Sequence, residues 1–255
     1  MAQMPTDPQS ITYDVLVIGG GPAGATIAAL LAARGKSALL LEKDRQPRFH
    51  IGESLLPFNI SLLDKLGVLD SVERIGMLKL GIEFVSPHHD APSFLSFSDS
   101  WHKEMSYAFQ VRRSDFDQIL LKNAASKGAV VIEGCRATAV EFRQSADVLV
   151  TSETDDRQCQ EWKARFLVDA SGRDSFLADR LKLKRKNRRH ASAAIFGNFI
   201  HAERLSGQAE GSISIFWFEK GWFWFIPLAA GTTSVGVVCN LIFSELAKRT
   251  SLVFL

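Results

Sequence analysis

The feature that most constrains the fold is a glycine-rich run between a short apolar segment and an alanine-rich one. This run, GGGPAG, places Gly19, Gly21 and Gly24 at the spacing GxGxxG. Between a strand and a helix, the first glycine permits a tight turn, the second lets a pyrophosphate approach the backbone, and the third lets the helix pack closely on the strand. The N–H groups at the start of the helix then bind the phosphates. The residues expected to contact a nucleotide are Gly19, Gly21, Pro22, Ala23 and Gly24.

The segments around this run complete a βαβ unit. YDVLVI is a β-rich run before the glycines, and an alanine-rich helix is expected from about Ala25 to Arg34. The apolar run over 37–41 is typical of a parallel strand buried on both faces. Glu42 ends this strand 18 residues after Gly24, where a carboxylate can accept hydrogen bonds from ribose hydroxyls. A glycine-rich turn without a ligand is the alternative, but the complete context favours a nucleotide site.

The rest of the chain indicates two lobes of different composition. A helix is expected over 114–126, a strand over 130–133 and a β-meander over 137–169. Over 193–240, Phe, Trp, Ile and Val alternate with other residues, which predicts a mostly antiparallel second sheet. The basic run over 182–190 is interpreted as a solvated linker. The fold class is therefore α/β, with a three-layer Rossmann-like domain of parallel sheet interleaved with a sheet-rich domain.

Composition excludes several kinds of partner. The chain has 30 basic and 28 acidic residues, so no long-range field favours nucleic acid or an anionic membrane. No apolar stretch approaches the length of a spanning helix, and the N-terminus does not resemble a secretory signal, so we expect a cytoplasmic protein. Three cysteines at wide spacing form no metal-binding motif, so no metal site is expected.

Three motifs resemble one superfamily of flavoproteins. GGGPAGATIAALLAARG followed by LLLEK resembles the N-terminal signature of the FAD-binding fold in aromatic hydroxylases, geranylgeranyl reductases and halogenases. DASGR resembles a strand-end motif of that fold, which implies that Asp169 and Gly172 lie at the flavin. QVRRSDFD resembles a pattern in which Arg113 contacts the flavin. An ion pair with Asp117, one helical turn later, is the alternative, and both can hold at once.

A fourth motif is more discriminating. GWFWFIP fits WxWxIP, which resembles the signature of the flavin-dependent halogenases, and it comprises Trp222, Trp224, Ile226 and Pro227. In a strand, alternation places both tryptophans and the isoleucine on one face, where the rings could screen the flavin from a substrate. Packing of a core or of an interface between lobes is the alternative.

Two further segments resemble halogenase motifs. KLGIEF resembles the pattern KxGxxF, which implies that Lys79 is the catalytic residue. Its ammonium group can hydrogen-bond hypohalous acid, or its amine can form a haloamine; a surface lysine is the alternative. RFHIGESLLP resembles a loop shared by halogenases and related reductases, which implies that Arg48 and Ser54 contact the flavin or a bound chloride.

The resemblance implies a halogenase that uses FAD as FADH2, dioxygen and chloride or bromide. Its substrate would be an aromatic small molecule or a carrier-protein-bound aromatic, and a separate flavin reductase would supply FADH2. The alternatives are an aromatic hydroxylase, a geranylgeranyl-reductase-like oxidoreductase, or an inactive flavin-binding fragment. In the superfamily a Gly-Asp motif and a helical region normally follow; the sequence contains no Gly-Asp pair and resembles a truncated member. The expected domains are 11–78 with 105–185 for FAD, and 79–104 with 186–255 for the substrate.

Overall fold

The computed structural model divides the chain into two compact units, each built from separated segments. It describes residues 11–104, 106–144, 147–185, 187 and 192–240. The first unit comprises residues 1–51, 65–68 and 113–184, and the second comprises 52–64, 69–112 and 185–255. Residues 52–64, 69–78 and 105–112, which we expected in the FAD-binding domain, therefore group with the second unit. Residues 186 and 188–190 of the expected basic linker lie outside the described residues.

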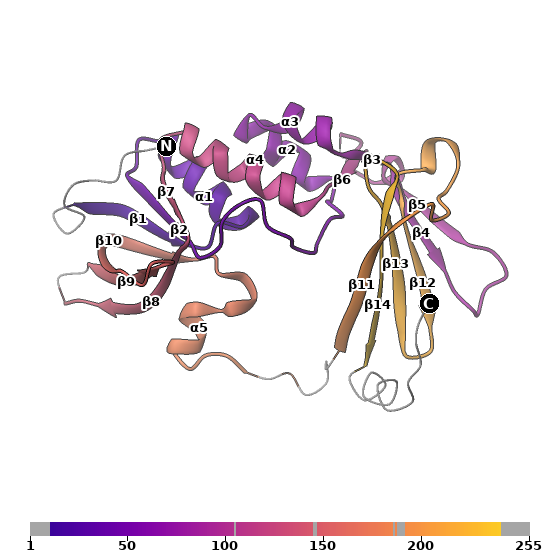
Figure 1. Ribbon diagram of the computed structural model, residues 1–255. Helices are drawn as coiled ribbons and strands as arrows, with labels where there is room; N and C mark the ends of the chain where they lie inside the picture. Colours follow the sequence, from indigo (N-terminus) through magenta and orange to yellow (C-terminus); the bar gives the residue numbers. More distant parts are fainter. Residues whose placement is uncertain (1–10, 105, 145–146, 186, 188–191, 241–255) are drawn as a thin grey trace. The chain divides into compact units, whose positions relative to one another are not determined.

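The first unit contains a six-stranded sheet in the order β7-β2-β1-β10-β9-β8 (Figure 1). Its strands are β1 (Thr12–Ile18), β2 (Ala38–Glu42), β7 (Val130–Glu133), β8 (Cys135–Phe142), β9 (Val148–Thr154) and β10 (Cys159–Asp169). The neighbours from β7 to β10 are parallel, whereas β9 pairs with both β10 and β8 in antiparallel fashion. The expected α/β class is confirmed, and the predicted meander extends the parallel sheet.

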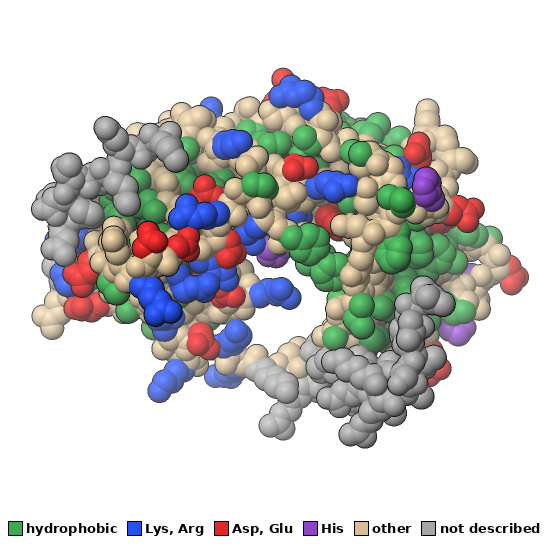
Figure 2. Space-filling view, in the orientation of Figure 1, with side chains coloured by type: hydrophobic (Ala, Val, Ile, Leu, Met, Phe, Trp, Pro, Cys, Tyr) green, Lys and Arg blue, Asp and Glu red, His purple; other side chains and the backbone are tan. Residues whose placement is uncertain are grey.

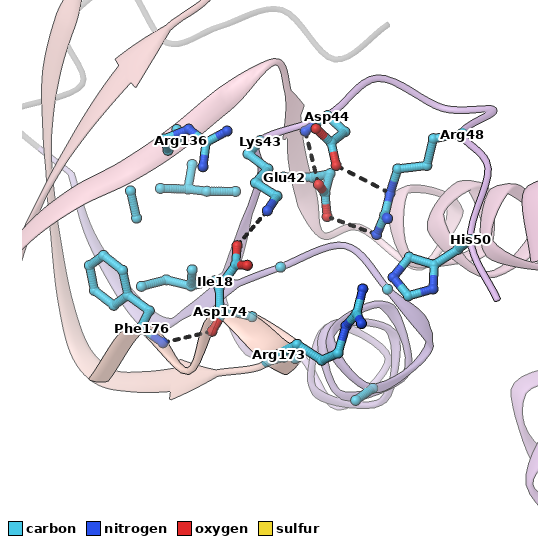
Figure 3. Close-up of a pocket in the computed structure, with 18 of the residues that line it drawn as sticks. Ile18, Glu42, Lys43, Asp44, Arg48, His50, Arg136, Arg173, Asp174 and Phe176 are labelled. Atoms are coloured by element: carbon cyan, nitrogen blue, oxygen red, sulfur yellow. Dashed lines mark hydrogen bonds and ion pairs between the residues drawn. The ribbon is translucent and has the colours of Figure 1, made fainter. Parts of the chain in front are cut away.

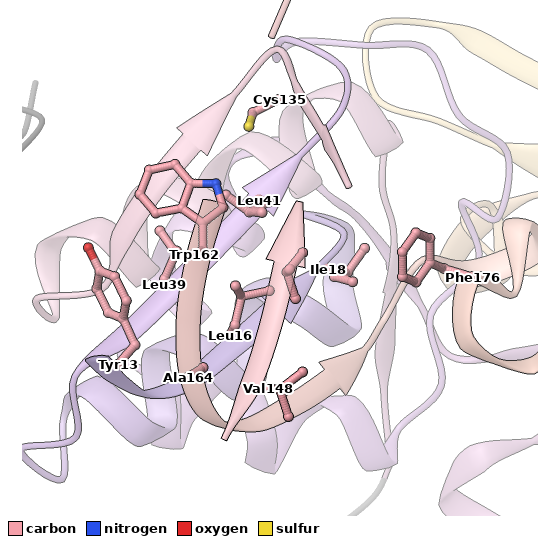
Figure 4. Packing of buried hydrophobic residues seen from close by; sticks show 11 residues of the cluster. Tyr13, Leu16, Ile18, Leu39, Leu41, Cys135, Val148, Trp162, Ala164 and Phe176 are labelled. Atoms are coloured by element: carbon pink, nitrogen blue, oxygen red, sulfur yellow. The ribbon is translucent and has the colours of Figure 1, made fainter. Parts of the chain in front are cut away.

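Helices and the meander supply the packing partners of the parallel strands. Helices α1 (Pro22–Ala32) and α4 (Arg113–Ser126) contact each other, α1 contacts β1 and β2, and α4 contacts β7. Alternate residues of the strands, such as Leu16 and Leu39, join a buried cluster with Val150 and Trp162 of the meander (Figure 4). The indole N–H of Trp162 donates to Ser152 Oγ at 2.7 Å, so the one polar atom of this ring is satisfied inside the core.

The second unit contains a six-stranded sheet in the order β11-β14-β13-β12-β4-β5. Its strands are β4 (Gly81–Val85), β5 (Ser93–Ser96), β11 (Ser192–Ile200), β12 (Ile213–Phe218), β13 (Gly221–Pro227) and β14 (Thr232–Asn240). All neighbouring pairs are antiparallel except β12 with β4. The prediction of a mostly antiparallel second sheet is therefore confirmed. Large apolar side chains of this sheet are exposed, among them Ile195, Phe199 and Trp217 (Figure 2).

A small ladder and several short helices complete the fold. Strand β3 (Met77–Lys79) pairs antiparallel with β6 (Ala108–Gln110). The short helices are α2 (Phe58–Leu66), α3 (Leu69–Ile75), α5 (Phe176–Arg180) and the 3-10 turns η2 (Phe97–Asp99), η3 (Gly172–Asp174) and η4 (Gly207–Ala209). No helix in the described ranges is long and apolar enough to cross a membrane. Within the same ranges, no His, Cys, Asp and Glu side chains are grouped as a metal site requires.

Candidate functional site

Of the three glycines in the GxGxxG pattern, the fold itself requires two, and the remaining one has open space beside it. Gly19 has φ +103°, and a Cβ there would lie 2.4 Å from the Ala170 carbonyl oxygen. A Cβ on Gly24 would lie 1.8 Å from the Gly19 carbonyl oxygen. A Cβ on Gly21, by contrast, would meet no atom nearer than Arg48 Nη2 at 4.0 Å. The space beside Gly21 is therefore open, as close approach of a phosphate requires.

The start of α1 offers backbone donors to this open space. Pro22 occupies the first helical position, and Gly21, the N-cap residue, has no side chain to bond the N–H groups of the first turn. These N–H groups have no partner within the helix, and the helix dipole favours an anion at this end. The loop and the helix start together form an anion site of the kind that binds a nucleotide pyrophosphate.

Glu42, at the end of β2, is placed to bind a ribose. Its side chain is 3% exposed. It accepts hydrogen bonds from the backbone N–H groups of Gly20 at 2.5 Å and Asp44 at 2.9 Å. Arg48 Nη2 lies 3.8 Å from the same carboxylate (Figure 3). A carboxylate has about four acceptor sites, so Glu42 is held in place and can still accept ribose hydroxyls.

A cavity of about 780 Å³ lies at the ends of β1, β2 and β10, and its lining belongs wholly to the first unit. Six basic and four acidic side chains line it, which leaves two net positive charges and complements the negative charge of a pyrophosphate. Of the expected cofactor-binding residues, the cavity is lined by Gly19, Gly21, Pro22, Ala23, Glu42, Arg48, Arg113 and Gly172.

Several charged residues of the cavity were not expected from the sequence. Lys43 Nζ bonds the Asp174 carboxylate across the cavity and holds the pKa of that carboxyl below its usual value (Figure 3). Lys43 directly follows Glu42, and Asp174 follows the DASGR motif, so adjacency could have found both. Arg136 in β8 and Arg180 in α5 carry no such signal, because only the tertiary fold brings them to the cavity.

Two residues of the DASGR motif have different positions: Asp169 holds a turn, and Gly172 lines the cavity. The Asp169 carboxylate lies outside the cavity lining and accepts hydrogen bonds from the N–H groups of Ser171 at 3.0 Å and Leu177 at 2.8 Å. It therefore stabilises the turn that leads into α5. Gly172 lines the cavity with φ +64°, a conformation that favours glycine.

Arg113 forms the ion pair that the sequence left open as an alternative. Its Nε and Nη2 atoms donate to the Asp117 carboxylate at 2.7 and 2.9 Å, in a bidentate arrangement. Its Nη1 atom donates to the Ile51 carbonyl oxygen at 2.7 Å. Because Arg113 also lines the cavity, the ion pair and a cofactor contact are compatible, and the contact itself remains a prediction.

The second unit contains a buried lysine. Lys79, at the end of β3, is 1% exposed. Its Nζ atom donates to Ser54 Oγ at 2.9 Å and to the Leu55 carbonyl oxygen at 3.0 Å. It also lies 5.2 Å from the centroid of the Phe97 ring. Burial lowers the pKa of Lys79 to about 8. The alternative of a surface lysine is therefore wrong, and Ser54 lies against this lysine.

Strand β13 carries the WxWxIP motif with its two tryptophans in different environments. Trp224 is 8% exposed, and a Cβ on Gly236 would lie 2.2 Å from its ring. The indole N–H of Trp224 donates to Ser234 Oγ at 3.3 Å, and its ring stacks with Phe196. Trp222 is 42% exposed. Trp224, Ile226 and Pro227 are buried, so the alternative that the motif packs a core describes these three residues. Trp222 instead presents its ring at the surface of the second unit.

The fold and the cavity of the first unit define a dinucleotide-binding α/β protein, because the strand, the glycine loop, the helix start and the terminal carboxylate occur together. Comparison with known proteins specifies the class further. The chain belongs to the FAD binding domain family, whose match covers residues 12–249. The residues present fit FAD, since Gly21 leaves room for a pyrophosphate, Glu42 can bind a ribose and the cavity is net positive.

Known relatives confirm the resemblance to flavin-dependent halogenases. The 1H-pyrrole-2-carbonyl-[peptidyl-carrier protein] chlorinase of Pseudomonas fluorescens is 33% identical over 249 residues, which cover 89% of this chain and 55% of the relative. The tryptophan 2-halogenase of Chondromyces crocatus is 36% identical over 230 residues, which cover 89% and 43%. The structure of the myxobacterial chondrochloren halogenase CndH matches with a TM-score of 0.80 and 33% identity, over 93% of this chain and 55% of that one. The chain spans about half the length of these relatives.

Proposed function

We propose that this chain carries the cofactor site and the lysine of an FADH2-dependent halogenase. The observation that carries the proposal is Lys79, an amine 1% exposed with a pKa of about 8, in a chain that also has an FAD pocket. Lysines are rarely fully buried, and strongly perturbed pKa values cluster at functional sites. The halogenase relatives and the WxWxIP strand support halide oxidation over the other reactions of the superfamily.

The first unit would bind the cofactor through the residues of its cavity. The glycine loop and the start of α1 would bind the pyrophosphate, Glu42 would accept the ribose hydroxyls, and Arg48 would add positive charge. Reduced FAD would supply the two electrons with which dioxygen, chloride or bromide and a proton give hypohalous acid and water. A separate flavin reductase would return the cofactor to FADH2.

Lys79 would direct the halogen to the substrate in one of two ways. As an ammonium group it would donate a hydrogen bond to hypohalous acid and hold the electrophilic halogen in place. As an amine it would attack the halogen, forming an N–halogen bond while the O–halogen bond breaks and water leaves. With a pKa of about 8, roughly one tenth of Lys79 is the amine at pH 7, so both forms are accessible.

The tryptophans of β13 would have different roles. Trp224 is fixed by Gly236, Ser234 and Phe196, so it would shape the strand. Trp222, with its exposed ring, would face a ligand and screen the flavin from the substrate. An electron-rich aromatic is the expected substrate, either as a small molecule or attached to a carrier protein. The carrier-protein chlorinase among the relatives supports the second form.

The test uses a halogen acceptor that does not depend on knowing the substrate. The purified chain would be supplied with FAD, a flavin reductase, NADH, dioxygen, bromide and a set of electron-rich aromatics, with methionine added to consume hypohalous acid that escapes into solution. Mass spectrometry would report the halogenated acceptor for the unaltered chain and a loss of more than about tenfold for Lys79→Ala, whose thermal midpoint and FAD binding should match those of the unaltered chain. Lys79→Arg keeps the cation but cannot serve as the amine, so activity in this variant would select the hydrogen-bonding role.

Each alternative function gives a different product. Retained halogenation by Lys79→Ala would refute the role of the lysine. A product that gains oxygen, with or without halide, would identify a hydroxylase, and reduction of a prenyl chain would identify a reductase. FAD binding without any halide oxidation would identify a flavin-binding protein that is not a halogenase.

A further inference from the structure

We propose that Ser54 is a positioning residue for Lys79. The proposal concerns which way the reactive amine points, so its catalytic consequence rests on the proposed function. Its structural basis does not, because it lies in contacts within the second unit. The Ser54 hydroxyl and the Leu55 carbonyl oxygen both accept hydrogen bonds from Lys79 Nζ.

The segment that carries Ser54 is held like a strand. Leu55 N–H donates to the Phe109 carbonyl oxygen at 3.0 Å, and Val111 N–H donates to the Glu53 carbonyl oxygen at 2.8 Å. Ser54 itself lies opposite Gln110 in an antiparallel bridge. Backbone hydrogen bonds on both sides of Ser54 fix the direction of its side chain. The hydroxyl is therefore presented to Lys79 by a segment that is paired with β6.

Two of the three hydrogen-bonding directions of Lys79 Nζ are taken by the contacts described above. An ammonium group has three N–H donors, and Ser54 Oγ and the Leu55 carbonyl oxygen take two of them. When the group is a neutral amine, its two N–H bonds can stay with the same acceptors. The lone pair then occupies the third direction. Ser54 would thus point a hydrogen-bond donor or a nucleophilic lone pair, according to protonation state, along one axis.

The partners of Lys79 in these contacts are neutral, which has a consequence for its protonation. The Phe97 ring, 5.2 Å from Nζ, adds a cation–π attraction but no countercharge. A hydroxyl accepts more strongly from the ammonium than from the amine but adds no countercharge, whereas a carboxylate in the same place would favour the ammonium far more and raise its pKa further. The charged groups on the packed segments are Glu53, which is buried, and Asp99, which is exposed. Ser54 therefore orients the group without preventing deprotonation.

The test is a titration of Lys79 in the purified 255-residue chain without FAD. Lysine labelled with carbon-13 at Cε would be followed by NMR from pH 6 to 11, and the signal missing from Lys79→Arg would assign Lys79. When a lysine loses a hydrogen bond that stabilises its ammonium form, its pKa falls by about one unit. We therefore expect Ser54→Ala to shift the titration down from about 8 by that amount. Ser54→Thr, which keeps the hydroxyl, should titrate as the unaltered chain does.

A matched control is Ser61→Ala, which removes an exposed hydroxyl of α2 in the same unit. It should leave the titration of Lys79 unchanged. Equal titration curves for Ser54→Ala and the unaltered chain would overturn the proposal, as would a Ser54→Thr curve that matches Ser54→Ala. Failure of the proposed function is distinguished by the halogenation assay of Lys79→Ala, whose outcome does not alter these curves.

Discussion

The ion pair between Arg113 and Asp117 gives the sharpest prediction about the first unit. The Asp117 side chain is fully buried and the Arg113 side chain is 11% exposed. Replacement Asp117→Asn keeps the shape of the side chain but removes its charge, so the guanidinium of Arg113 stays buried without a counterion. Breaking a buried pair in this way costs about 3 kcal/mol or more. The equilibrium constant for unfolding should therefore rise by more than about a hundredfold.

Hydrogen exchange measures this loss where it occurs. Peptides from α4, analysed by mass spectrometry, should exchange faster in Asp117→Asn by a factor that corresponds to the same free energy. The control is Asp115→Asn, an exposed residue in the first turn of the same helix, for which we expect a loss below about 1 kcal/mol. The double replacement Arg113→Met with Asp117→Leu should cost less than the two single replacements added together. Equal exchange in Asp117→Asn and Asp115→Asn would refute the reasoning.

Three further predictions concern other parts of the chain. Burial lowers the pKa of Lys79 from 10.5 to about 8, so the folded chain binds fewer protons than the unfolded chain between pH 8 and 10.5. The free energy of unfolding should therefore rise as the pH rises through this window, by up to about 3 kcal/mol. Urea titrations of the unaltered chain and of Lys79→Met, compared across this window, measure the rise. Ser152→Ala should cost about 1–3 kcal/mol, measured by thermal unfolding, because it leaves the buried Trp162 indole N–H without its acceptor. Gly236→Ala should displace the Trp224 ring, which a new Cβ would meet at 2.2 Å, and so change the tryptophan fluorescence.

The cofactor cavity of the first unit could be predicted from sequence because its signals are local. The glycine spacing, the strands around it and Glu42 lie within one βαβ unit, where adjacency in sequence fixes adjacency in space. The charged side chains of β8 and α5 could not be predicted in this way. Arg136 and Arg180 reach the cavity only because the meander and α5 return to the ends of the parallel strands.

The lysine site was predicted from a motif, but its surroundings were not. Nothing in KLGIEF indicates that Lys79 is buried, since most lysines lie at the surface. Its acceptors, Ser54 and the Leu55 carbonyl oxygen, come from a segment more than twenty residues earlier that adds to β6. The sequence motif implied that Ser54 contacts the flavin or a bound chloride, and that contact remains a prediction. The structure shows instead that Ser54 Oγ accepts a hydrogen bond from Lys79 Nζ.

The central claim, that the open space at Gly21 receives the phosphates of FAD, is tested by titrating the chain and two glycine variants with FAD. Thermal midpoint and flavin fluorescence would be followed together. The unaltered chain should bind saturably with a raised midpoint. Gly21→Ala should keep the cofactor-free midpoint, because the added Cβ enters open space, yet lose at least about tenfold in FAD affinity. Gly24→Ala should lower the cofactor-free midpoint. A folded chain that fails to bind FAD, or a Gly21→Ala variant that binds it equally well, would contradict the account.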